Sequence, residues 1–296
     1  MIRIILNGKK AGLETVRSAI SLLREEVEGV EVRVTYEYGD VKRFVDEAMR
    51  DNVTRLVIGG GDGSVNEVVN ALAKYPRAQR LQLAILPLGT ANDFSTACTI
   101  PMNSLEALRL AVSGKTMPID IAKANEEYFI NMATAGFGAK VTAETPVELK
   151  NFLGGGAYTL VGVLKALHFT PYMATVKTSR FDMQVSGVIA AVCNGRQAGG
   201  GQVMAPKAYI NDGLLDVLII KEVFKADISQ LLEEVKNPNR EGEYVKYFQT
   251  TWLESESEEV IPVNLDGEPY ANTKIRFEVV PAAIDLVLPE NCPCLK

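Results

Sequence analysis

Residues 54–70 read TRLVIGGGDGSVNEVVN and combine an apolar run, a glycine loop and the start of a helix. The apolar run at residues 56–58 is typical of a strand buried on both faces. Glycines at residues 59–61 let the backbone lie directly against a ligand. Ser64 lies where a helix would start, and Glu67 follows at capping-box spacing. We therefore expect free amides and the positive end of a helix dipole to point at a phosphate here.

This loop matches neither of two common phosphate-binding motifs. No lysine lies near Gly63, which excludes a P-loop, and Asn66 stands where a dinucleotide-binding loop would have its third glycine. A tight turn made by the glycines is the simplest alternative. Asp62, however, places an acid among amides that should collect anions. Its position favours a functional role with a metal, a sugar hydroxyl or a proton.

Length, composition and net charge limit the kinds of protein that this chain can be. The chain has 296 residues, 47% hydrophobic and 23% charged, which allows two soluble globular domains. A net charge of -6 argues against nucleic-acid binding and against a polybasic membrane anchor. The sequence has no apolar run near the roughly 20 residues of a spanning helix, and it opens with a strand-like run rather than a signal peptide. We expect a cytoplasmic protein.

Cysteine and histidine usage argues against several kinds of catalytic site. Cys98 and Cys193 lie in apolar stretches and are interpreted as buried thiols rather than ligands. Cys292 and Cys294 form a C-x-C pair, and the sequence shows no evident partner for them as metal ligands. His168 has no evident acid or nucleophile beside it. We expect neither a Ser-His-Asp enzyme nor a histidine-ligated metal site.

The first part of the chain alternates between strand-like and helix-like patterns. The expected strands are residues 2–7, 30–36, 56–58, 82–86 and 118–122, and the expected helices include residues 12–26, 40–49 and 104–113. This order predicts a parallel sheet with helices on both faces. Thr35 then lies at the carboxyl edge of the sheet, where ligands bind in open α/β folds.

A second glycine turn, PLGTANDFS at residues 87–95, follows a neighbouring strand. Thr90, Asn92 and Asp93 crowd it with hydroxyl, amide and acid groups, for which helix capping alone is the alternative explanation. Two such loops after neighbouring strands would face each other across one crevice. This arrangement predicts a nucleotide site.

The second half reads mainly as short strands between turn residues, which predicts an antiparallel β-sandwich. The expected strands are residues 128–133, 173–178, 181–186, 187–193, 214–220, 259–264 and 274–280. Residues 136–138 are expected to turn, residues 145–170 to be mostly helical around glycines 154–156, and residues 225–235 to form a helix. The acidic residues 254–259 are interpreted as a solvated loop.

Three loops of this half carry candidate site residues. The polar loop NGRQAGGG (194–201) is placed to lie over a cleft. In YINDGL (209–214), Asp212 and flanking carbonyls suit Mg²⁺ or Ca²⁺, although D-G alone is usually a turn. In NLDGE (264–268), Asp266 and Glu268 offer carboxylates for a metal and for proton abstraction, with a hairpin turn as the alternative.

Six segments in register resemble the diacylglycerol kinase catalytic-domain family, and within it the bacterial YegS-like lipid kinases. They are GGGDGSVNEV (59–68), PLGTANDF (87–94), FINMATAGFG (129–138), NGRQAGGG (194–201), AYINDGLLDV (208–217) and NLDGE (264–268). The resemblance covers essentially the full chain and implies ATP-dependent, Mg²⁺-dependent phosphorylation of a lipid hydroxyl.

The resemblance also implies a fold. Residues 1–122, with a returning segment at about 287–296, would form a Rossmann-like α/β nucleotide-binding domain similar to 6-phosphofructokinase and NAD kinase. Residues 123–286 would form the antiparallel β-sandwich that carries the metal and acid sites. The active site would lie in the cleft between the two domains.

Family positions map onto residues of this chain. The implied ATP contacts are Thr35, Gly61, Asp62, Gly63, Ser64, Val65, Asn66, Glu67 and Thr90; the implied metal ligands are Tyr209, Asp212 and Leu214; the implied proton acceptor is Glu268. Ser64 replaces the usual threonine but keeps the hydroxyl. Asp62 and Asp266 are secondary candidates, and the division of base and metal roles among these acids stays open.

The acceptor is open as well. Phosphatidylglycerol, diacylglycerol and a sphingoid base are all compatible with the pattern, with transient contact to a membrane surface. The apolar residues within 149–169 are interpreted as core, with a lipid-binding wall as the alternative. A kinase of a soluble hydroxyl acceptor, as NAD kinase is, and a nucleotide sensor without catalysis are the alternative functions. The sequence predicts no nucleic-acid partner and does not define an oligomeric state.

Overall fold

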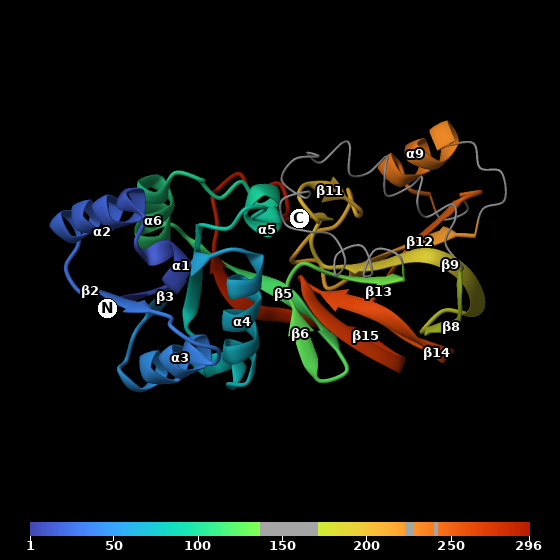
Figure 1. Cartoon of the computed structure of the whole chain (residues 1–296), viewed down its shortest axis with the longest axis horizontal. Coiled ribbons are helices and arrows are strands. Elements are labelled where there is room, and N and C mark those ends of the chain that lie inside the picture. The colour runs from blue at the N-terminus through green and yellow to red at the C-terminus, as the bar shows by residue number, and fades with distance from the viewer. Residues whose placement is uncertain (137–170, 223–227, 240–241) are drawn as a thin grey trace.

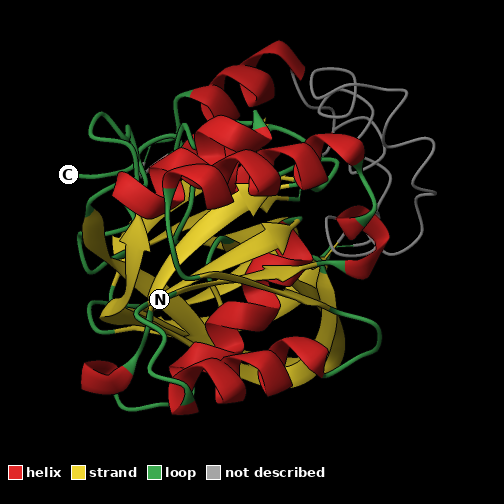
Figure 2. Ribbon diagram, turned by 90° about the vertical axis from the view of Figure 1, so that its left-hand side faces the viewer, coloured by secondary structure: helices red, strands yellow, loops and turns green. Residues whose placement is uncertain are grey.

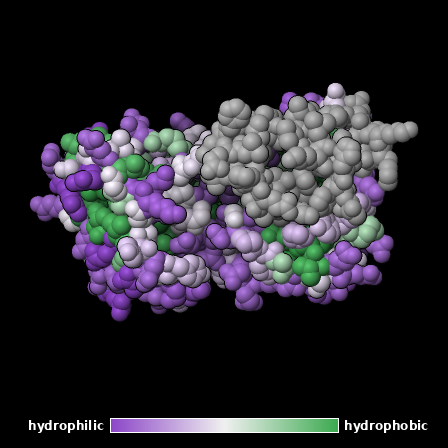
Figure 3. Space-filling view, viewed as in Figure 1, coloured by the Kyte–Doolittle hydropathy of each residue, from purple (hydrophilic) through white to green (hydrophobic). Residues whose placement is uncertain are grey.

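A computed structural model describes residues 1–136, 171–222, 228–239 and 242–296 as two lobes side by side (Figure 1). The first lobe is a layered α/β structure and the second is built mainly of strands. None of the helices in the described ranges is long and apolar enough to cross a membrane. Hydrophilic residues dominate the face seen in Figure 3 outside small hydrophobic areas.

The first lobe contains a parallel sheet in the order β4 (Gln82–Pro87), β3 (Arg55–Gly60), β1 (Ile2–Leu6), β2 (Val30–Val34). Helices α2 (Glu14–Glu26) and α6 (Ser104–Ser113) pack on one face. Helices α3 (Asp40–Arg50) and α4 (Asp62–Ala73) pack on the other, so helices flank the strands in Figure 2. The predicted parallel sheet covered on both faces is confirmed. The bounds of its elements differ from the predicted ones by a few residues.

The short helix after β1 was not predicted. α1 (Gly8–Ala11) begins directly after β1, where the Asn7 side chain accepts a hydrogen bond from the Lys9 amide. The extended backbone of Leu13 separates it from α2, which shortens the predicted helix over residues 12–26.

The second lobe is antiparallel. Its strands are β5 (Thr116–Ala124), β6 (Glu127–Phe129), β7 (Met132–Gly136), β8 (Tyr172–Thr178), β9 (Asp182–Cys193), β12 (Leu215–Lys221), β13 (Val245–Thr250), β14 (Trp252–Leu265) and β15 (Glu268–Val287). A small hairpin joins β10 (Gln197–Ala198) to β11 (Gln202–Val203), and α9 (Ile228–Lys236) packs outside. Facing strands enclose one apolar core that includes Phe129, Val217 and Phe277. These features agree with the predicted sandwich.

The long strand β15 joins the two lobes. Its first half pairs with β14, its second half pairs with β5, and Leu286 pairs in parallel with Leu83 of β4. The register between β15 and β5 shifts between Val280 and Ile284. There the carboxylate of Asp120 accepts a hydrogen bond from the Ala282 amide at 2.7 Å. One strand thus belongs both to the sandwich and to the parallel sheet of the first lobe.

Two expectations about strands were wrong. The acidic residues 254–259 lie within β14 rather than in a loop, because residues 254–256 pair with both β15 and β8. Glu254 and Glu256 also form ion pairs with Lys274 on β15, at 3.0 and 3.1 Å. The strand expected at residues 128–133 is interrupted after Phe129, because the amides that follow it bind Asp266 instead of a neighbouring strand.

Other expectations lie wholly or partly outside the described residues. They are the turn beyond Gly136, the helical stretch 145–170 with glycines 154–156, the lipid wall 149–169, His168, and the start of the helix expected at 225–235. The segments 181–186 and 187–193, expected as two strands, form the single strand β9 with a register shift beside Gly187.

Candidate active site

The two glycine loops lie against each other at the carboxyl ends of β3 and β4. The Leu88 amide donates to the Gly60 carbonyl at 2.8 Å. A Cβ atom added to Gly89 would lie 2.5 Å from the Gly61 Cα and 2.7 Å from the Asn92 side-chain oxygen. Backbone contacts backbone here, which requires glycine at both positions. The prediction that the two loops face each other is confirmed.

The start of α4 differs from the prediction. The helix begins at Asp62 with Gly61 as its N-cap residue, so Ser64 lies within the first turn and the expected capping box is not formed. Because glycine has no side chain, no side-chain oxygen caps α4. Its first amides therefore stay available to an anion that lies against the loop.

Asp62 caps a different helix. Its carboxylate oxygens accept the amides of Asp93 and Phe94, both at 3.2 Å, in the first turn of α5 (Asp93–Ala97). Burial and the charge of Asp93 raise the pKa of Asp62 above its ordinary value. Asp62 thus binds the first glycine loop to the second, a role that spans 31 residues of sequence and was not predicted.

Asp93 extends this chain of contacts to the second lobe. Its carboxylate accepts the amides of Gly200 and Gly201, at 2.9 and 2.6 Å, from the hairpin between β10 and β11. Both glycines have positive φ. The polar loop 194–201 therefore lies against the second glycine loop, while its place over a cleft stays a prediction.

Asp266 connects β7 and α4. Its carboxylate accepts the amides of Ile130, Asn131 and Met132, at 2.7, 3.0 and 2.9 Å, and the side-chain amide of Asn66 at 3.1 Å. Burial raises the pKa of Asp266 to about 6, against the lowering effect of the backbone hydrogen bonds. With these donors in place, the carboxylate of Asp266 is committed to holding the two lobes together.

Glu268 occupies a different environment two residues later. Glu268 is exposed, and one of its carboxylate oxygens lies 3.9 Å from the position that a Cβ atom on Gly63 would take. Burial is the larger cause that raises the pKa of Glu67, and the negative charge of Glu268 is the second. Glu67 and Glu268 therefore face the same space beside the first turn of α4.

The remaining predicted ATP contacts surround or support this space. The Thr35 hydroxyl oxygen accepts the Gly8 amide at 3.1 Å, and Thr90 is exposed on the second glycine loop. Val65 is buried in the core, and the Asn66 side chain is bonded to Asp266, so the two lie beneath the loop. Asn70, which was not predicted, exchanges two hydrogen bonds with the backbone of Tyr128, at 2.8 and 3.0 Å.

The predicted cation loop lies beside β5. The Asp212 carboxylate accepts the Leu214 amide at 3.1 Å, and Asp120 accepts the Gly213 amide at 2.7 Å. Burial raises the pKa of Asp212, and Asp120 adds to the rise while Lys296 opposes it. A carboxylate with nearby main-chain carbonyls and a second acid suits a hard divalent cation. Sequence patterns did not reveal Asp120, because it lies within a strand.

Three of the four cysteines come together. The sulfur atoms of Cys98, Cys292 and Cys294 all lie within 4.8 Å of one another, and all three residues are buried. Cys98 is a buried thiol, as predicted, but it is also the partner of the C-x-C pair that the sequence did not reveal. Cys193 lies apart, fully buried in β9.

Comparisons with known proteins agree with this architecture. A family model described as "Diacylglycerol kinase catalytic domain" matches residues 1–124, and one described as "YegS C-terminal NAD kinase beta sandwich-like domain" matches residues 131–288. A "Probable lipid kinase YegS-like" of Shewanella frigidimarina is 53% identical, with 99% of this chain and 96% of that protein covered. A protein of the same description from Yersinia enterocolitica is 44% identical, with 99% and 98% covered.

A solved structure agrees as well. A putative diacylglycerol kinase from Bacillus anthracis superposes with a TM-score of 0.83 at 25% sequence identity, covering 98% of this chain and 96% of that chain. The chain therefore belongs to the diacylglycerol kinase catalytic-domain family and is a kinase with an N-terminal α/β domain and a C-terminal β-sandwich. The domain limits at residues 122 and 287 stay predictions, since β15 contributes to both domains.

Proposed function

We propose that the protein transfers the γ-phosphate of ATP to a hydroxyl group of a lipid. The observation that carries this proposal is the exposed carboxylate of Glu268 beside the first turn of α4, opposite the two glycine loops. Names of similar proteins as probable lipid kinases support the same class of reaction.

The glycine loops and α4 supply a place for the triphosphate. The first amides of α4 carry no side-chain cap, and the closely packed glycines let phosphate oxygens approach the backbone. We assign Thr35, Gly61, Gly63, Ser64 and Thr90 to the nucleotide from their places around this space. Val65 and Asn66 support the loop from beneath.

Among the three candidate acids, Glu268 is the best proton acceptor. Asp62 and Asp266 each accept several backbone hydrogen bonds, whereas no hydrogen bond to the Glu268 carboxylate occurs within the described residues. A Glu268 oxygen would take the proton of the acceptor hydroxyl while that hydroxyl oxygen bonds to the γ-phosphorus. The bond from phosphorus to the β–γ bridging oxygen breaks, and ADP leaves.

The acids also suit divalent cations. Glu67 and Glu268 face one space, and a cation there would relieve their mutual repulsion. We propose that Glu67 and the phosphate oxygens hold Mg²⁺, which supplies positive charge against that of the triphosphate. A second cation, Mg²⁺ or Ca²⁺, is proposed for the Asp212 carboxylate with the main-chain oxygens of Tyr209 and Leu214, in a structural role.

The interior of the sandwich offers room for part of an acyl chain. An apolar cavity of about 60 Å³ opens between its sheets, lined by residues such as Ala133, Val192, Leu253 and Ile275. Ala133 directly follows Met132, whose amide binds Asp266, so the cavity begins close to the acid loop. The volume admits part of a chain, and a longer chain requires the sheets to separate. Phosphatidylglycerol and diacylglycerol are the proposed acceptors, reached by transient contact with the cytoplasmic membrane surface.

The test is transfer of label from γ-labelled ATP, with Mg²⁺, to a bacterial lipid extract in detergent micelles, followed by thin-layer chromatography. We expect one labelled lipid band, and its loss by at least a hundredfold in Glu268→Gln because general-base catalysis contributes about 10²–10⁴-fold. ATP binding should persist in this variant. Glu258→Gln, which changes an exposed acid on β14, is the matched control and should keep full activity.

Two other outcomes would overturn the lipid assignment. Labelling of NAD but not of lipid would indicate a soluble acceptor, which the NAD kinase-like description of the second domain favours. ATP binding without transfer to lipid or NAD would indicate a nucleotide sensor. Full activity in Glu268→Gln would reject Glu268 as the base.

A further inference from the structure

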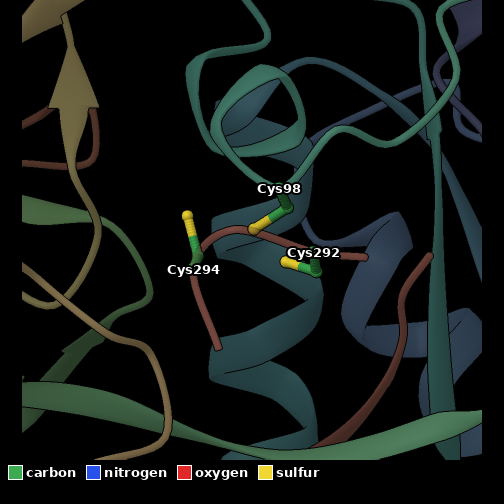
Figure 4. A group of neighbouring side chains, drawn as sticks. All are labelled: Cys98, Cys292 and Cys294. Carbon is green, nitrogen blue, oxygen red and sulfur yellow. The ribbon is translucent and has the colours of Figure 1, made fainter. Parts of the chain in front are cut away.

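The cysteine cluster formed by Cys98, Cys292 and Cys294 lies outside the proposed active site. Cys98 ends α5, while the other two belong to the C-terminal tail, nearly 200 residues later. Their exposed fractions are 1%, 6% and 1%. In Figure 4 the Cys98 and Cys292 sulfur atoms point toward one another, with Cys294 from the same tail beside them.

The backbone of the tail is folded to present both of its cysteines. The Cys292 amide donates to the Pro289 carbonyl at 3.1 Å, and the Leu295 amide donates to the Cys292 carbonyl at 3.3 Å. These turns bring side chains two residues apart to the same side. The tail is held further by the Ile210 amide, which donates to the Cys294 carbonyl at 2.9 Å.

The spacing of the sulfur atoms fits metal coordination. Zn–S bonds of about 2.3 Å place the sulfur atoms of a tetrahedral site about 3.8 Å apart. The observed limit of 4.8 Å on every sulfur pair lies within an ångström or so of that value. The Cys294 thiol donates to the Ala97 carbonyl at 3.2 Å, which brings a main-chain oxygen to the edge of the cluster.

A positively charged side chain, Arg196, also lies where it can compensate the negative charge of such a site. Three thiolates around a divalent cation carry a net charge of -1, which an apolar surrounding would disfavour. The positive charge of Arg196 acts on both tail cysteines. The Arg196 guanidinium is fixed by a 2.8 Å hydrogen bond from Nε to the Ala208 carbonyl.

We propose that Cys98, Cys292 and Cys294 bind one soft metal ion, with Zn²⁺ as the physiological candidate. Thiolate ligands select soft and borderline ions over Mg²⁺ and Ca²⁺, so this site and the oxygen-lined site at Asp212 take different metals. Binding displaces the three thiol protons, and the Ala97 carbonyl or a water completes the coordination. The ion cross-links the tail to the end of α5, which carries Asp93.

Cobalt provides a direct test, because Co²⁺ in a thiolate site absorbs strongly in the near ultraviolet by sulfur-to-metal charge transfer. The reduced full-length protein, free of metal and oxygen, is titrated with Co²⁺ and then with Zn²⁺. We expect the absorption to saturate at one Co²⁺ per chain and to be lost when Zn²⁺ is added.

Matched variants separate the cluster from buried cysteines in general. Cys292→Ala should abolish the cobalt absorption, whereas Cys193→Ala removes an equally buried but isolated thiol and should keep it. If Cys292→Ala does not fold, the proposal is tested on the wild-type protein instead. Bound Zn²⁺ should then raise its melting temperature by several degrees.

Several results would overturn the proposal. They are no cobalt absorption in the reduced wild-type protein, an equal loss in Cys193→Ala, or retention in Cys292→Ala. A disulfide within the cluster in anaerobically purified protein, detected by mass spectrometry, would overturn it as well and indicate a redox pair. An unchanged melting temperature with Zn²⁺ would mean that the thiols are merely packed in the core.

Discussion

Three carboxylates near the first turn of α4 differ in the groups that already bind them. Asp62 accepts the amides at the start of α5, and Asp266 accepts three amides and the Asn66 side chain. Glu268 is exposed beside Gly63. Similar acids therefore serve different purposes, because a carboxylate that organises backbone amides is a poor choice for moving a substrate proton.

This difference predicts that Asp266 and Glu268 respond oppositely to mutation. Asp266→Ala leaves three backbone amides without their acceptor and should lower the free energy of unfolding by about 3 kcal/mol. Glu268→Gln should leave stability within about 0.5 kcal/mol of wild type while activity is lost. Urea unfolding of both variants measures this, and equal destabilisation would reject the separation of roles.

Of these residue roles, sequence reasoning identified the acids but not their partners. The motif around residues 264–268 pointed to both Asp266 and Glu268, but it did not show which of the two abstracts a proton. The contacts that distinguish them connect residues 134–200 positions apart. Local patterns carry no signal for such pairs. The same holds for Asp120 and for the cysteine cluster.

At the level of elements, the proposed nucleotide site depends on two loops in backbone contact. Gly89→Ala would place a methyl group 2.5 Å from the Gly61 Cα. We expect the loops to separate at a cost of about 1–3 kcal/mol, which corresponds to roughly a five- to 150-fold loss of ATP affinity. Isothermal titration measures the affinity. Gly12→Ala, where nothing lies within 4 Å of the added atom, is the control; equal affinities in both variants would contradict a tight contact.

The loop after Thr35 is organised by the start of α3. The Asp40 carboxylate accepts the amides of Tyr36 and Glu37, at 2.6 and 3.1 Å, and pairs with Arg43. These bonds, first that from the Tyr36 amide, lower the pKa of Asp40 to about 2.

Because the folded pKa lies below the ordinary value of 3.8, ionised Asp40 stabilises the protein above about pH 4. This contribution is lost as the pH falls toward 2. Asp40→Asn should therefore be less stable than wild type at pH 5, and the difference should shrink at pH 3. Chemical unfolding at both values tests this, with Glu25→Gln as an exposed control. A constant difference would contradict the assignment.

The spacing of apolar residues predicted helices well where a helix buries one continuous apolar face. Helix α6 was placed at its observed residues, and α2 and α3 within a few residues, because each buries a continuous apolar stripe. The prediction failed where tertiary contacts override local composition. Residues 254–259 are too acidic to suggest a strand, but residues 254–256 pair with β15, and Lys274 on that strand binds both Glu254 and Glu256.

For the whole molecule, β15 couples the stability of both lobes. Leu286→Ala, at a fully buried position in the first lobe, should cost about 2–5 kcal/mol. Trp252 is the one tryptophan and lies in β14 of the sandwich, so its fluorescence reports on the second lobe. Helical circular dichroism reports mainly on the first.

We expect the two signals to shift together in Leu286→Ala, in a single transition. Separate transitions, with fluorescence unchanged, would show that the lobes unfold independently despite the shared strand. Phe277→Ala, buried in the sandwich, is the reciprocal variant and should also move both signals.

The place of β15 in the chain has a consequence for synthesis on the ribosome. Strand β4 is complete by Pro87, but its second neighbour in the sheet ends at Val287, 200 residues later. Until Val287 has left the ribosome, β4 remains an open edge that can pair with another chain. The first lobe, although its other strands are translated early, is therefore completed late, and nascent or truncated chains should depend on chaperones to escape aggregation.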